Sequence, residues 1–240
     1  HCSYPAQAWI NTRWLEELDL EMPSTHEEFR DVLRAFKTED PNGNGKPDEI
    51  PMSGTVAWPE TLPIPFLMNG FIYDDTVTRL ILDGDKVDFV ANKPEWKEGL
   101  AFIASLYEEE LIDPGAFTQN ADAYRQLGNN LEIPILGVAP ATHPGVFATN
   151  LDYQYQYDPI GPLEGPNAQY TTYKYSSTPG GTFVLTNKAS EEARVAAIKL
   201  LDYMFTVEGQ LRSHFGEEGV GWRGPQEGDV AVNENVEPIF

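Results

Sequence analysis

The chain has 240 residues and a hydrophobic fraction of 41%, which suffices for one large domain or two modest ones with a real core. Its 38 Asp and Glu against 16 Lys and Arg give a formal net charge of −22, which repels nucleic acid and anionic membranes. The single cysteine, Cys2, excludes an internal disulfide and multi-cysteine zinc sites. We interpret Cys2 as a small buried residue, because no apolar signal segment precedes it as a lipid-anchor cysteine requires.

Hydrophobic spacing predicts helices in the first part of the chain. Apolar residues recur at helical intervals over residues 9–18 and again over 29–36. The second run follows Thr25 and Glu28, whose spacing is that of a capping box at a helix start. Residues 40–51 are polar and rich in Gly and Pro, so they predict a loop.

The rest of the chain alternates predicted strands and helices, which favours an α/β architecture. A short apolar run predicts a buried strand, and a Pro or Ser before an apolar helical stripe predicts a helix start. The expected elements are a helix over 64–71, a hairpin over 79–90, a helix from Pro94 to 106, strands over 133–139 and 182–185, and helices from Ser190 to 205 and over 207–215.

The loop over residues 40–49 carries the most specific motif of the chain. Oxygen-bearing side chains stand at alternate positions, and Gly45 stands where a calcium-binding EF-hand loop turns sharply. Such spacing lets several oxygens converge on one hard cation, so we predict a calcium (Ca²⁺) site. The predicted ligands are Asp40, Asn42, Asn44, the backbone carbonyl of Lys46, Asp48 and Glu49.

The loop departs from an EF-hand at its end. Pro51 occupies the twelfth position, where an EF-hand carries a bidentate Glu, and Glu49 is the residue that could replace it. Pro47 and Pro51 also exclude a long helix leaving the loop. The alternative is a solvated Asn-Gly turn with scattered acidic residues.

Several segments, taken together and in order, resemble the extracellular solute-binding proteins of carbohydrate ABC importers, in the superfamily of the maltose-binding protein. The calcium loop and the following residues resemble the subgroup that includes alginate-binding proteins and many Gram-positive lipoproteins. The segments that carry the resemblance are 9–18, 23–29, 40–54, 177–183, 191–209 and 216–222.

The resemblance implies a type II periplasmic-binding-protein-like fold, with two lobes joined by hinges and a ligand cleft between them. Residues 1–176 would form one nearly complete lobe, the second, and 177–240 the crossover and part of the first lobe. Family members carry a signal peptide and a long segment before the first crossover, so we expect this chain to be a fragment. The full-length protein would be an extracellular lipoprotein or periplasmic, monomeric, and served by ABC permease subunits.

Candidate sugar contacts follow from the chemistry of sugars and from the resemblance. A pyranose needs a flat apolar ring against its face and polar groups for its hydroxyls. Trp58 stands among prolines in a predicted loop, and Trp222 stands in a Gly-rich loop. The full set of predicted ligand-binding residues is Trp58, Glu60, His143, Phe147, Gly180, Gly181, Trp222 and Arg223.

Two other functions remain open. A calcium-dependent glycoside-processing enzyme would need a pair of carboxylates, and nothing singles out two of the many acids. A calcium-stabilised adhesion or scaffold domain would need no small-molecule cleft. Because the sequence shows no nucleophile elbow, phosphate loop or zinc motif, we predict binding without catalysis.

Overall fold

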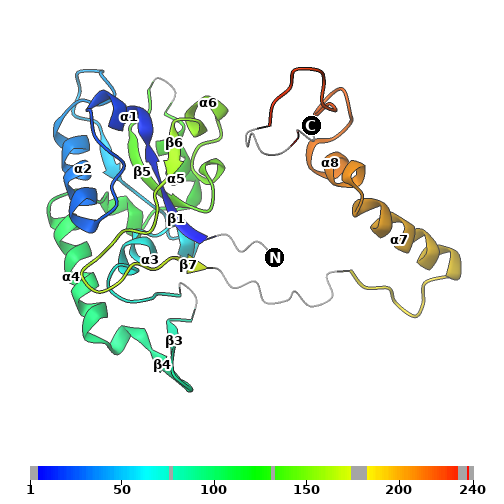
Figure 1. Ribbon diagram of the computed structural model, residues 1–240, viewed down its shortest axis with the longest axis horizontal. Coiled ribbons are helices and arrows are strands. Elements are labelled where there is room, and N and C mark those ends of the chain that lie inside the picture. The colour runs from blue at the N-terminus through cyan, green and yellow to red at the C-terminus, as the bar shows by residue number, and fades with distance from the viewer. Residues whose placement is uncertain (1–4, 76–77, 131–132, 174–182, 232–236, 238–240) are drawn as a thin grey trace. The chain divides into compact units, whose positions relative to one another are not determined.

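The computed structural model describes residues 5–75, 78–130, 133–173, 183–231 and 237, so Cys2 lies outside the described residues. The chain divides into two compact units, residues 1–177 and 178–240. Each unit is described by itself (Figure 1). None of the described helices is both long enough and apolar enough to cross a bilayer.

The first unit is built on a sheet in which β5 and β1 are central. The strands are β1 (Pro5–Asn11), β2 (Ile50–Met52), β5 (Leu136–Ala141), β6 (Tyr157–Pro159) and β7 (Thr172–Tyr173). Their order is β2-β5-β1-β6, with β7 pairing the first two residues of β1. β2 runs parallel to β5, and β1 pairs antiparallel with its three partners.

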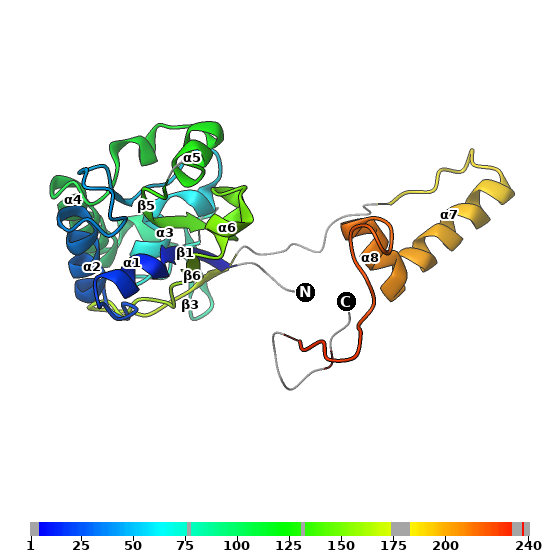
Figure 2. The same cartoon turned by 90° about the horizontal axis from the view of Figure 1, so that it is seen from above.

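Helices cover both faces of this sheet. They are α1 (Thr12–Glu17), α2 (His26–Thr38), α3 (Pro63–Met68), α4 (Pro94–Glu108), α5 (Ala121–Gly128) and α6 (Leu151–Gln154). Short 3-10 turns join them: η1 (Pro59–Thr61), η2 (Val90–Asn92), η3 (Pro114–Phe117) and η4 (Pro144–Val146). Figures 1 and 2 show α2 and α4 together on one side, with α5 and α6 on the other.

Two apolar cores explain why every residue of β5 is buried. Successive side chains of a strand point to opposite faces, so Val138 packs in the core under α2 and α4. Its neighbour Ala139 packs in the second core, with Tyr124 of α5. Because both faces of β5 are covered, its sequence is a continuous apolar run rather than an alternation.

The predicted capping box at the start of α2 is confirmed. The Thr25 hydroxyl accepts a hydrogen bond from the Glu28 amide at 3.2 Å, and the Glu28 carboxylate accepts from the Thr25 amide at 3.1 Å. The same carboxylate accepts from the Ser24 amide at 2.9 Å, and these bonds lower the pKa of Glu28. The reciprocal bonds satisfy amides that a helix start leaves without partners.

The prediction of one helix over residues 9–18 is wrong in its first part. Residues up to Asn11 belong to β1, where Trp9 pairs with Ala139 on one side and Pro159 on the other. The Asn11 side chain then accepts from the Trp14 amide at 3.3 Å and starts α1. Pairing with two neighbouring strands outweighs the helical spacing of the apolar residues.

The hairpin predicted over residues 79–90 is confirmed as β3 (Leu80–Asp83) and β4 (Lys86–Phe89), an antiparallel pair. The turn places Gly84 at φ +61°, a conformation that glycine adopts without strain. The strand predicted over 182–185 is not found: Thr182 lies outside the described residues, and 183–185 are exposed and form no strand.

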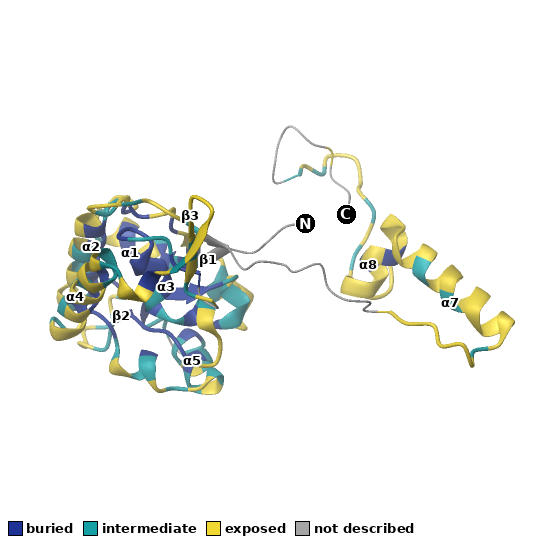
Figure 3. Cartoon of the chain, turned by 90° about the horizontal axis from the view of Figure 1, so that it is seen from below, coloured by how far each residue is buried: buried dark blue, intermediate teal, exposed yellow. Residues whose placement is uncertain are grey.

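The second unit contains the two predicted helices, α7 (Glu191–Met204) and α8 (Val207–Phe215). Ser190 caps α7 and Thr206 caps α8, each by accepting a hydrogen bond from a backbone amide of its helix. Gly209 allows the start of α8 to approach the end of α7, because a Cβ there would lie 2.0 Å from the Tyr203 carbonyl oxygen. No residue of α7 is buried (Figure 3).

Candidate functional site

A cavity of about 370 Å³ in the first unit brings together three of the residues predicted to bind a sugar. It opens between η1, α5 and the segment that follows β5. The residues that line it are Trp58, Glu60, Thr61, Arg125, Thr142, His143, Gly145 and Val146.

The backbone around η1 holds Trp58 at the surface. Trp58 precedes Pro59 in an extended conformation, and the side chain of Trp58 remains 38% exposed. The buried Thr61 hydroxyl lies 2.7 Å from the Trp58 carbonyl and 2.9 Å from the Thr55 carbonyl, so it can bridge them. This bridge, with the 2.8 Å bond from the Thr55 hydroxyl to the Gln119 carbonyl, fixes the turn that carries the indole.

Arg125 is a residue of this site that the sequence did not reveal. Its guanidinium carbon lies 5.8 Å from the centre of the Trp58 ring, within the range of a cation–π contact. It also pairs with Asp122 on the same helix at 3.4 Å. In the sequence, the spacing to Asp122 predicts only a surface ion pair, and nothing local connects Arg125 with Trp58.

His143 contributes an imidazole with a defined orientation. It precedes η4, and its Nδ1 accepts a hydrogen bond from the Gly145 amide at 3.1 Å. A neutral ring that accepts at Nδ1 carries its proton on Nε2, so Nε2–H is the donor His143 can offer to a ligand. The cavity therefore combines an indole face, a cation, an imidazole donor and the acceptor oxygens of Glu60.

Phe147 does not belong to the cavity, which corrects its prediction as a sugar contact. Its side chain is completely buried, with ring centres 5.0 Å from Tyr157 and 6.0 Å from Tyr124. Gly128 packs directly on it, since a Cβ at that position would lie 2.3 Å from the Phe147 carbonyl oxygen. The ring fills the second core and has no face to offer to a ligand.

The other predicted sugar contacts lie elsewhere. Gly180 and Gly181 lie outside the described residues. Trp222 belongs to the second unit, where its indole nitrogen donates to the Gly216 carbonyl at 3.1 Å. Arg223 pairs with Asp229 at 2.5 and 2.9 Å, which raises the pKa of Arg223 and lowers that of Asp229 to about 2.

The loop over residues 40–49 is wound around its own oxygen atoms. The Asp40 carboxylate accepts from the amides of Asn44 at 3.1 Å and Gly45 at 2.8 Å. Gly43 and Gly45 adopt φ +70° and +72°, a conformation that is unfavourable for residues other than glycine. The amide groups of Asn42 and Asn44 donate to Asp48 at 3.2 and 3.0 Å, and these bonds lower the pKa of Asp48.

Glu49 shows that this loop concentrates negative charge. Its Oε1 is buried and has no hydrogen-bond partner among the residues that the structure describes. Burial, followed by the charges of Asp40 and Asp48, raises the pKa of Glu49. A cation would relieve both the orphaned oxygen and the repulsion, so the donor set fits calcium. Within the described ranges, no three His, Cys, Asp or Glu side chains are gathered around a metal position, so a cation here would also need amide and backbone oxygens.

A larger cavity, of about 940 Å³, lies beside the β3–β4 hairpin. It contains none of the residues predicted from the sequence to bind a ligand.

Known proteins similar to this chain cover it well, although the chain spans less than half of each. It is 37% identical over 163 residues to the fructooligosaccharide ABC transporter substrate-binding protein FusA of Streptococcus pneumoniae, covering 68% of this chain and 29% of FusA. It is 29% identical over 235 residues to lipoprotein LipO of Bacillus subtilis, covering 88% of this chain and 42% of LipO. No protein-family model matches the chain.

Solved structures of substrate-binding proteins also match this chain over part of their length. An EF-hand mutant of FusA in complex with fructo-nystose matches with a TM-score of 0.66 and 30% identity, over 91% of this chain and 43% of that chain. The alginate-binding protein AlgQ2, solved without calcium ion, matches with a TM-score of 0.60 over 98% of this chain and 48% of that chain. At 22% identity, AlgQ2 shows the shared fold, which is the type II periplasmic-binding-protein-like fold.

Proposed function

We propose, on the premise that its homologues are substrate-binding proteins of ABC transporters, that this chain is part of a protein that binds an oligosaccharide for import. FusA is described as binding fructooligosaccharide, and it has been solved in complex with kestose and with fructo-nystose. A short oligosaccharide is therefore the ligand class we assign to this chain.

The observation that carries the proposal is the cavity around Trp58. An exposed indole face suits the apolar face of a sugar ring, and Glu60, Arg125 and His143 offer an acceptor and donors for its hydroxyls. The volume of about 370 Å³ is in the range of small-molecule sites.

The two units correspond in this proposal to parts of two lobes. Residues 1–176 form most of the second lobe, and residues 177–240 contain the crossover and a part of the first lobe. Gly180, Gly181, Trp222 and Arg223 would then reach the sugar from the crossover and the first lobe. Closure of two lobes on one ligand would couple binding to a conformational change, as an importer requires.

Calcium has a structural role in this proposal. Asp40, Asn42, Asn44, Asp48 and Glu49 would hold the ion with the Lys46 carbonyl. The loop joins the end of α2 to β2, so an ion there would tie a core helix to the central sheet. The EF-hand mutant of FusA and the calcium-free structure of AlgQ2 connect calcium with this group of proteins.

Binding without catalysis fits the cavity better than glycoside hydrolysis. Glycosidases use a pair of carboxylates on either side of the scissile bond. Among the described residues that line the cavity, Glu60 is the only acid. We further propose an extracellular location, as a surface lipoprotein or in a periplasm, with permease subunits as partners of a monomeric protein.

A titration of the ¹⁵N-labelled chain with kestose tests the proposal, because chemical shifts detect binding even at millimolar affinity. We expect saturable shifts of the Trp58 indole and of residues 142–146. The absence of saturable shifts there with kestose and a panel of other oligosaccharides would overturn the assignment of this cavity to a sugar. Shifts without any sugar hydrolysis would separate a binder from both an enzyme and a scaffold domain.

A further inference from the structure

The β3–β4 hairpin presents an apolar face that nothing in the described structure covers. Its register places Leu80 opposite Phe89 and Leu82 opposite Val87. Alternation along each strand puts these four side chains on one face. They are 42%, 46%, 76% and 65% exposed, respectively, so two directly opposed apolar pairs face solvent.

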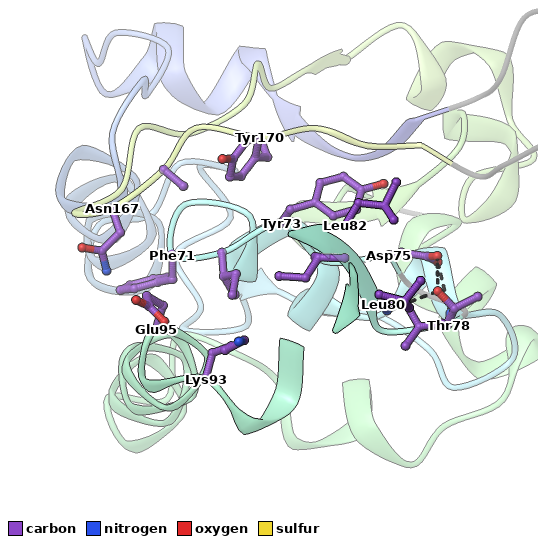
Figure 4. A pocket seen from close by; sticks show the side chains of 14 residues that line it. Phe71, Tyr73, Asp75, Thr78, Leu80, Leu82, Lys93, Glu95, Asn167 and Tyr170 are labelled. Carbon is purple, nitrogen blue, oxygen red and sulfur yellow. Dashed lines mark hydrogen bonds between the residues drawn. The ribbon is translucent and has the colours of Figure 1, made fainter. Parts of the chain in front are cut away.

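The cavity of about 940 Å³ adjoins this hairpin (Figure 4). Leu80, Leu82 and Val87 form part of its wall, and Tyr73 and Tyr170 also line it, with Tyr73 beside Leu82 in the view. The two tyrosine rings meet edge to face, with centres 5.9 Å apart. At about 940 Å³ and with mostly apolar side chains beside the hairpin, the cavity has room for a ligand of several residues.

The hairpin also offers its backbone. β3 and β4 form a two-stranded sheet, and neither pairs with another strand in the part of the chain that the structure describes. An open strand edge is a template for an added strand, and an apolar face beside it supplies pockets for alternate side chains. The geometry therefore suits an extended peptide segment.

The charges around the cavity decide which segment can bind. Lys93 already pairs with Asp88, and the charges of Asp83 and Glu95 also raise the pKa of Lys93. Asp85 adds another acid at the exposed hairpin turn. Arg79 pairs with Asp74, and the bases Lys86 and Lys93 are outnumbered by the acids Asp75, Asp83, Asp85, Asp88 and Glu95. Negative charge is therefore in excess at this face, and the complementary partner carries positive charge.

We propose that the β3–β4 face and its cavity form a docking site for an extended, apolar segment of a protein partner, flanked by Lys or Arg. This site is separate from the sugar cavity and does not depend on what that cavity binds. A second copy of this chain is a poor occupant, because its net charge of −22 and its acidic hairpin turn would face the same charges.

Two labelled peptides test the proposal with the whole chain. The probe is a blocked hexapeptide, Lys-Leu-Thr-Val-Leu-Lys, and its partner carries Glu in place of both Lys. Fluorescence anisotropy should show saturable binding of the basic peptide and roughly tenfold weaker binding of the acidic one. Equal binding of both peptides, or no binding of the basic one, would contradict the proposal.

The double variant Leu82→Ser, Val87→Ser should weaken binding of the basic peptide roughly tenfold. The matched control is Leu151→Ser, which removes an exposed leucine from α6, away from the hairpin, and should bind like the wild type. Circular dichroism checks that each variant folds. Unchanged binding of the basic peptide by the double variant would show that the β3–β4 face is not the docking site. A concentration-dependent dimer that this variant disperses would instead identify a second copy as the occupant and overturn the proposed partner.

Discussion

The guanidinium carbon of Arg125 lies 5.8 Å from the centre of the Trp58 ring, although Trp58 precedes η1 and Arg125 belongs to α5. A cation placed over an indole restrains the orientation of the ring. The contact therefore restrains the Trp58 ring where it lines the cavity instead of leaving it free to turn.

Trp58→Ala should weaken oligosaccharide binding roughly tenfold without unfolding the chain, because it removes a stacking surface but no core residue. Isothermal titration calorimetry or the chemical-shift titration measures the effect. Tyr155→Ala, which removes an exposed aromatic ring that does not line the cavity, is the matched control. Equal affinity of the Trp58 variant and the wild type would remove this residue from the site.

Arg125→Ala should weaken sugar binding by the energy of an exposed cation–π contact, about 0.5–1 kcal/mol. It should also shift the emission of Trp58, because the indole loses its charged neighbour. Arg125→Lys should retain part of both effects. Asp122→Ala serves as the control, since it removes only the exposed ion pair with Arg125. If Asp122→Ala lowered the sugar affinity as much as Arg125→Ala does, the effect would belong to the ion pair and not to the cation–π contact.

Removal of calcium with EDTA should lower the melting temperature, because an ion that binds only the folded state stabilises it. Glu49→Gln gives a sharper test. The pKa of Glu49 is raised in the folded chain, so its ionised form destabilises the calcium-free fold as pH rises above its unfolded pKa. In EDTA at neutral pH, the variant should therefore melt higher than the wild type.

With calcium added, the Glu49→Gln variant should gain less stability than the wild type, because it lacks one charged ligand. Glu39→Gln, an exposed neighbour outside the proposed ligand set, is the control and should behave like the wild type. Thermal melts that are the same with calcium and with EDTA would rule out the ion. A Glu49→Gln variant that melts at a lower temperature than the wild type in EDTA would contradict the proposed repulsion at Glu49.

His26 should make the first unit lose stability between about pH 6.5 and 4. Its ring is buried between Phe71 and Phe102, with centres 5.0 and 4.8 Å away. Burial, aided by the charge of Arg30, lowers the pKa of His26 from 6.5 to about 4 against the opposing effect of the Leu67 backbone carbonyl.

The sign follows from which state binds the proton. Below pH 6.5 the unfolded chain protonates this histidine while the folded chain does not, so acid favours unfolding until the folded pKa is reached. The loss is on the order of 3 kcal/mol. Urea denaturation at several pH values across this range gives the free energy of unfolding, which should change less with pH for His26→Gln than for the wild type. NMR titration of the ring measures the pKa of His26 directly. A ring that titrates near pH 6.5 in the folded chain would contradict this prediction.

Features that depend on neighbouring residues were predictable from the sequence. The capping box needs only Thr25 and Glu28, the hairpin needs an Asp-Gly turn between apolar strands, and the oxygen spacing of the calcium loop is set by residues 40–49. In each of these, the interacting atoms belong to one short segment. Local spacing therefore limits which contacts are possible, and the sequence displays that spacing.

Tertiary structure decided everything that depends on what a residue packs against. Trp9 has helical spacing, yet it lies in a strand because β5 and β6 flank it. Phe147 and Trp58 are both large aromatic residues in loops, yet one fills a core and the other lines a cavity. Arg125 joins the site only because α5 packs near η1. Burial and long-range proximity are properties of the assembled chain, since distant segments create them together, and no single segment contains the information.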